Sequence, residues 1–71
     1  MSAPLRVICV GAGYFAAFHH EAWARHPRTQ MVAVVDADIA RARAVGPSAY
    51  ESLSAALDAH DADIIDLVVP P

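Results

Sequence analysis

The stretch VICVGAGYFAAFHHEAW, residues 7–23, decides the fold. A continuous apolar run from Val7 to Val10 ends at Gly11-Ala12-Gly13, and a stretch without glycine or proline follows. Short apolar runs of this kind are typical of a strand buried on both faces, as in a parallel sheet. The segment therefore predicts a strand, a tight glycine turn and a helix in direct succession.

The rest of the chain repeats this alternation of strands and helices. We expect strands at 5–10, 30–35 and 64–69, with a very short one at 48–50, and helices at 14–25, 37–45 and 53–60. His26-Pro27 ends the first helix because a residue before proline avoids the helical region, and Ser52 suits the N-cap of the third. Such alternation predicts an α/β fold, an incomplete doubly wound parallel sheet with strand order 3-2-1-4.

The composition indicates part of a larger protein. Of 71 residues, 56% are hydrophobic and only 18% are charged, which is more apolar surface than a small independent chain hides easily. The single cysteine cannot form an internal disulfide, and no Cys/His pattern suggests zinc. We therefore expect residues 1–71 to be one incomplete unit, the N-terminal part of a larger α/β protein.

Charge and hydropathy exclude several functional classes. The net charge of −3 argues against binding to nucleic acid. No apolar run approaches the roughly 20 residues that a membrane span needs, and the N-terminus lacks the organisation of a signal peptide. One cysteine that is predicted to be buried fits a reducing compartment, so the cytoplasm is the expected location.

The glycine turn has the features of a dinucleotide site. Gly11 would allow the tight turn, Gly13 would let the backbone approach a diphosphate, and Ala16 is small enough for the helix to touch the strand. Free amides and the dipole at the start of the helix attract an anion. Asp36 ends the next strand 20 positions after Ala16, where a carboxylate binds ribose hydroxyls.

Asp36 also bears on the choice of cofactor. Its carboxylate repels a 2′-phosphate, which favours NAD over NADP. Arg41 and Arg43 are close enough in sequence to offset this preference, so NADP stays possible. Tyr14 and Phe15 lie next to the turn, where they would shield the cofactor.

The end of the last predicted strand completes the site. If the strand order is 3-2-1-4, Val69 and Pro70 face the Gly11 turn across the crevice where the strand order reverses. Pro70 could form a stiff wall of the crevice or simply start a helix. The predicted cofactor-binding residues are Gly11, Gly13, Tyr14, Phe15, Ala16, Asp36, Arg41, Val69 and Pro70.

Other reactive side chains are expected to be structural. His19 and His20 are adjacent on a helix and diverge by about 100°, so they form a poor metal chelate. Cys9 lies within a strand without an evident base and should be an inert thiol. Asp66 lies within an apolar strand and needs a partner, because a buried unpaired carboxylate is costly.

These residues resemble the Gfo/Idh/MocA oxidoreductases. The N-terminal pattern of that family, G-x-G-x-x-G-x-x-H-x-x-A, is matched by Gly11, Gly13, Ala16, His19 and Ala22, with alanine at the third glycine. Four further features of the family also match in order and spacing: the acid after VAVV, the Arg41-Ala42 pair, the Tyr50–Leu57 stretch and the ending VVPP. In the last of these, Val69 stands in place of threonine.

The resemblance implies a two-domain dehydrogenase that transfers a hydride between NAD(P) and a sugar, polyol or related carbonyl compound, and that forms homo-oligomers. It also implies a proton-transfer lysine in a Glu-Lys-Pro motif beyond this chain, which itself contains no lysine. No catalytic residue is therefore assigned here, and the isolated chain should be inactive. Two alternatives remain: a regulatory NAD-binding module of the same fold, and a methyltransferase, which can also place an acid after its second strand.

Overall fold

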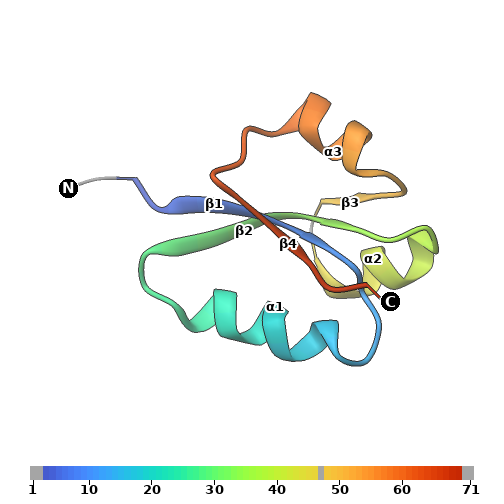
Figure 1. The fold of residues 1–71 in the computed structure, drawn as a ribbon, viewed down its shortest axis with the longest axis horizontal. Coiled ribbons are helices and arrows are strands. Elements are labelled where there is room, and N and C mark those ends of the chain that lie inside the picture. Colours follow the sequence, from blue (N-terminus) through green and yellow to red (C-terminus); the bar gives the residue numbers. More distant parts are fainter. Residues whose placement is uncertain (1–2, 47, 70–71) are drawn as a thin grey trace.

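The computed structural model describes residues 3–46 and 48–69. The elements in chain order are β1 (Leu5–Val10), α1 (Ala16–Arg25), β2 (Thr29–Val35), α2 (Ile39–Val45), β3 (Ala49–Tyr50), α3 (Leu53–Ala59) and β4 (Ile64–Leu67). The strands pair in parallel in the order β3-β2-β1-β4 (Figure 1). The predicted α/β fold and the 3-2-1-4 order are confirmed.

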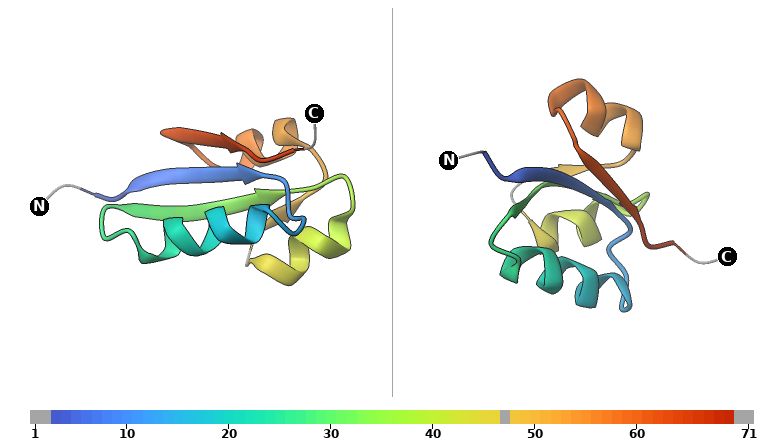
Figure 2. Two further views of the ribbon diagram at one scale, coloured as in Figure 1. Left: turned by 60° about the horizontal axis from the view of Figure 1, so that its bottom comes forward. Right: turned by 60° about the vertical axis from the view of Figure 1, so that its left-hand side comes forward.

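Helices cover both faces of the sheet. Figure 2 shows α1 and α2 against one face and α3 against the other. On the α3 side, Ile8, Ala33 and Val35 pack with Ala56 in one buried cluster. Val7, Cys9 and Val34 are buried as well. Both faces of the central strands are therefore apolar, which explains the continuous hydrophobic runs at residues 7–10 and 31–35.

The ends of the elements differ slightly from the prediction. The helix expected from Tyr14 begins at Ala16, because the preceding residues belong to the glycine turn. The helix expected from Ala37 begins at Ile39, because the Asp38 side chain caps it by accepting a hydrogen bond from the Ala40 amide. The last strand ends at Leu67 rather than Val69. Ser52 caps α3 as expected, accepting from the Ala55 amide.

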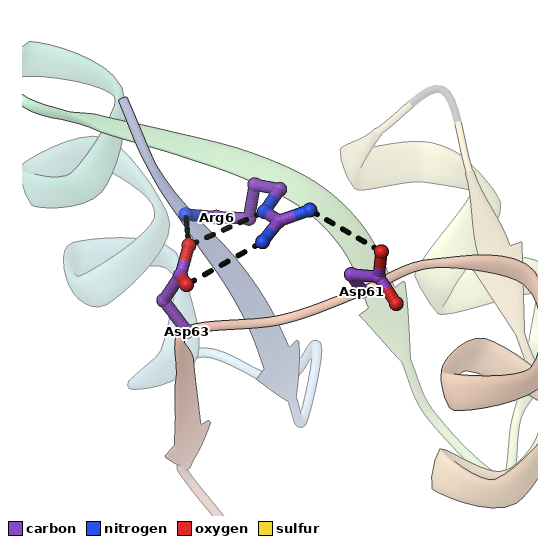
Figure 3. Close-up of polar contacts among 3 residues, drawn as sticks. All are labelled: Arg6, Asp61 and Asp63. Carbon is purple, nitrogen blue, oxygen red and sulfur yellow. Dashed lines mark hydrogen bonds and ion pairs between the residues drawn. The ribbon is translucent and has the colours of Figure 1, made fainter. Parts of the chain in front are cut away.

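An acidic clamp fixes the start of β4 to β1 (Figure 3). Asp63 accepts hydrogen bonds from the Arg6 backbone amide, at 2.8 Å, and from Arg6 Nε, at 3.2 Å. Asp61 pairs with the same guanidinium at 3.4 Å. The amide bond and the ion pair to Arg6 hold the pKa of Asp63 below its usual value. The clamp lies at the amino end of β1, away from the glycine turn.

Candidate functional site: a cleft at the carboxyl ends of the strands

A cleft of about 830 Å³ opens where β1, β2 and β4 end. Its wall includes the β1–α1 turn, the residues after β2, the first turn of α3 and the chain after β4. Among the predicted cofactor-binding residues, those that line the cleft are Gly11, Gly13, Tyr14, Phe15, Ala16, Asp36, Arg41 and Val69. Pro70 lies outside the described residues.

Gly11 is required by the fold itself. Its φ of +117° lies in a region that side chains rarely allow, and a Cβ there would overlap the backbone carbonyl of Val68. The Gly11 amide donates to the Val35 carbonyl at 2.7 Å. Its carbonyl accepts from Nε2 of the buried His20 at 3.0 Å. Gly11 is therefore held between the end of β2, the Val68 backbone after β4 and His20 of α1.

Gly13 has no comparable structural reason to be glycine. Its φ lies outside the left-handed region, and a Cβ would meet only the Arg41 guanidinium, at 4.0 Å. The space beside its backbone opens into the cleft. The missing side chain therefore leaves main-chain atoms of the turn accessible from the cleft.

The start of α1 is polarised and has no capping side chain. Phe15 occupies the N-cap position without a side-chain hydrogen bond, and the first turn contains no acidic residue. Ala16 is 2% exposed, so a larger residue would separate the helix from the sheet. A helix start of this kind attracts an anion through its amides and its dipole.

Asp36 reaches back from β2 to the glycine turn. Its Oδ2 accepts a hydrogen bond from the Ala12 amide at 2.9 Å, and its Oδ1 accepts from the Asp38 amide at 2.8 Å. The Asp36 amide donates to the Tyr50 carbonyl at 3.0 Å. These bonds fix a carboxylate beside the turn, within the same cleft.

Sequence reasoning missed the contribution of β3 and α3. Glu51, Ser52 and Leu53 line the cleft beside Asp36. The parallel sheet could have revealed them, because carboxyl ends of parallel strands meet at one edge and Glu51 directly follows β3. Glu51 brings a second carboxylate to the cleft, and Arg41 brings a cation.

Tyr14, Phe15 and Phe18, in the turn and the first part of α1, are exposed rather than packed in the core. Tyr14 is 77% and Phe15 74% exposed, and Phe18 is also exposed. Tyr14 contacts both phenylalanine rings edge to face. The buried face of α1 is formed by Ala16 and His20 instead, so Phe15 and Phe18 are not core residues of this chain.

The two histidines of α1 have hydrogen-bond partners, and Cys9 is buried. His19 forms a hydrogen bond to Asp66 within β4, and His20 forms one to the Gly11 carbonyl in the turn after β1. Burial, together with the nearby Asp66 charge, raises the pKa of Cys9 to about 12, so it is a neutral thiol at physiological pH. Within residues 3–46 and 48–69 no group of three or more His, Cys, Asp or Glu side chains is placed to hold a metal ion.

The helices are also too short for a bilayer. None of those in the described part of the chain is both long and apolar enough to cross a membrane.

Comparison with solved structures finds the same fold in dehydrogenases. The WlbA dehydrogenase from Bordetella pertussis, solved with NADH and UDP-GlcNAcA, is 29% identical, with a TM-score of 0.84 over 94% of this chain. Myo-inositol 2-dehydrogenase from Lactobacillus plantarum is 20% identical, with a TM-score of 0.79 over 94% of this chain. This chain spans 22% of the length of each. A search of curated proteins finds no significant match.

The family comparison covers nearly the whole chain. Residues 5–71 match the Gfo/Idh/MocA model, which describes an oxidoreductase family with an NAD-binding Rossmann fold. The glycine turn, the carboxylate after β2 and the 3-2-1-4 sheet are the features on which such a nucleotide fold depends. The resemblance noted in the sequence is thereby confirmed, and the chain belongs to the Gfo/Idh/MocA oxidoreductase family as an NAD-binding Rossmann fold.

Proposed function

We propose that this chain is the N-terminal, cofactor-binding part of a longer NAD(P)-dependent dehydrogenase. The proposal is that the whole enzyme transfers a hydride to or from a sugar, a polyol or a related carbonyl compound. Its support is the family match and the two similar dehydrogenases, which this chain covers only over 22% of their length. The substrate and the proton-transfer group are expected to be held by residues outside these 71.

The residues of the cleft fit the two polar parts of NAD. The Gly11 and Ala12 amides already donate to Val35 and Asp36, so the amides from Gly13 to Ala16 would bind the diphosphate, and Gly13 leaves room for its approach. Asp36 would accept hydrogen bonds from the ribose hydroxyls. The observation that carries the proposal is the 2.9 Å bond from the Ala12 amide to Asp36, because it places the carboxylate beside the turn.

Apolar residues fit the remaining parts of the cofactor. Tyr14, Phe15 and Val69 line the cleft and would shield the dinucleotide from water on the side of the β1–α1 turn and the chain after β4. Pro70, which lies outside the described residues, stays a cofactor-binding residue predicted from the sequence. When bound, the nicotinamide ring would supply the hydride acceptor or donor, and the residues of this chain would hold and orient it.

The charges of the cleft favour NAD over NADP. Asp36 and Glu51 both present carboxylates, and a 2′-phosphate near them would be repelled. Arg41 is the opposing charge, but its Nε already lies 3.7 Å from Asp38 Oδ2. We therefore expect NAD to be the preferred cofactor, with weaker binding of NADP.

The cellular setting follows from the same proposal. A sugar-type small molecule is the expected substrate, and neither nucleic acid nor a membrane is an expected partner. We propose a cytoplasmic enzyme that forms homo-oligomers when full length.

Titration of the intact protein with NADH, followed by nicotinamide fluorescence, tests the proposal. Saturable binding of NADH, with weaker binding of NADPH and none of S-adenosylmethionine, is the expected result. Binding of S-adenosylmethionine instead of NADH would support the methyltransferase alternative and contradict the proposal.

A further inference from the structure

Asp66 is a mostly buried carboxylate in the middle of β4. Its side chain is 16% exposed, and Oδ2 accepts hydrogen bonds from His19 Nδ1 and Trp23 Nε1, both at 2.8 Å. We call Asp66, His19 and Trp23 the Asp66 cluster. Burial alone would raise the Asp66 pKa, but these bonds and the nearby imidazoles outweigh it and lower that pKa. The cluster therefore joins β4 to α1 through an ionised carboxylate.

Two residues beyond Asp66, the chain forms a wall of the cleft. The Val68 amide donates to the Val10 carbonyl at 2.8 Å, and the Val68 carbonyl lies where a Cβ on Gly11 would be. Val68 and Val69 both line the cleft. The chain after β4 therefore meets the glycine turn through the Val68 backbone, next to the end of β1.

Helix α1 also holds Gly11, the other partner in the contact with the Val68 backbone. His20, next to His19 in α1, donates from Nε2 to the Gly11 carbonyl at 3.0 Å. Adjacent histidines thus hold the glycine turn and β4 from one helix. Neither metal binding nor core packing alone explains the two histidines. This arrangement accounts for both, because His19 bonds to Asp66 and His20 bonds to the Gly11 carbonyl.

We propose that Asp66 is a positioning residue of the cofactor cleft, which holds β4 against His19 and Trp23 so that the Val68 backbone abuts Gly11. The inference rests on the proposed binding of a dinucleotide in that cleft. Asp66 does not line the cleft, so it acts on the cofactor only through Val68 and the turn.

The acidic clamp supplies a matched control. Asp63 also ties β4 to its neighbours through a carboxylate, but at the start of the strand and through Arg6. Its loss should lower stability without moving the cleft wall. A general loss of stability can therefore be separated from a displacement of Val68.

The test compares NADH affinity in three variants of the intact protein, at a temperature where each is folded. His19→Phe removes one donor to Asp66 at a half-exposed position, and we expect the NADH Kd to rise about fivefold, in the range that mutations coupled to a site produce. His19→Asn places an amide donor near the position of Nδ1 and should restore the native Kd. Asp63→Asn should lower the melting temperature and leave the Kd unchanged.

The outcomes separate the inference from the function on which it rests. An unchanged Kd in His19→Phe, an equal rise in Asp63→Asn, or failure of His19→Asn to restore binding would each overturn the positioning role while leaving the proposed function intact. Failure of the native protein to bind NADH would overturn both.

Discussion

Replacing Gly13 with alanine should separate cofactor binding from folding. A Cβ at this position has open space, with the Arg41 guanidinium at 4.0 Å as its nearest neighbour, and φ is not left-handed. Alanine in place of glycine at a compatible position stabilises a protein by about 0.4–1 kcal/mol, because it restricts the unfolded chain. We therefore expect the free energy of unfolding of Gly13→Ala to be unchanged or slightly raised.

The same methyl group would stand between the turn and a diphosphate. Loss of one hydrogen bond to a charged group costs about 1.5–3 kcal/mol, so we expect NADH affinity to fall roughly ten- to one-hundred-fold. Chemical denaturation and NADH fluorescence titration of the same preparation measure both quantities. Gly11→Ala is the contrasting variant, because φ of +117° and the Val68 carbonyl make it destabilising. Native affinity in Gly13→Ala would refute the assignment of this glycine to the cofactor.

Three further predictions concern other residues. Asp36→Asn should raise the ratio of NADPH to NADH affinity by roughly tenfold, since it removes the charge that opposes a 2′-phosphate; parallel titrations measure this, and an unchanged ratio would contradict the ribose assignment. Cys9, with a pKa of about 12, should react with a disulfide reagent at pH 8 only as fast as the protein unfolds, and fast labelling under native conditions would show that the thiol is accessible. The pKa of Asp66 is lower in the folded protein than in the unfolded chain, so its ionised form stabilises the fold. This stabilisation is fully present above the unfolded pKa of about 3.9 and is lost as the pH falls through the folded pKa. Acid unfolding of Asp66→Asn should therefore depend less steeply on pH below about 4 than that of the native protein, and identical profiles would count against an ionised Asp66.

The sequence predicts the fold well because its signals are local and repeated. The central strands contain apolar runs at residues 7–10 and 31–35, and helices have recognisable starts or stops, such as Ser52 or His26-Pro27. The sequence predicts the start of the first helix two residues too early. Tyr14 and Phe15 are compatible with a helix, but in the structure they belong to the turn after Gly11. Local pattern cannot show how far a turn extends when its residues also suit a helix.

The site is only partly visible in sequence. The glycine spacing and Asp36 indicate a nucleotide turn, but the bond from Ala12 to Asp36 depends on how β1 and β2 lie side by side. Glu51 was missed because its position in the cleft depends on the two-residue strand β3. The partners of Asp66 lie 43 and 47 positions away in the chain, so the sequence indicates the need for a partner but not its identity.

The most direct test of the central claim is a crystal structure of the intact protein with NADH. The account predicts the diphosphate on the backbone amides from Gly13 to Ala16, with a ribose hydroxyl within hydrogen-bond distance of Asp36. A dinucleotide bound elsewhere, with this turn empty and Asp36 free of the ribose, would contradict it.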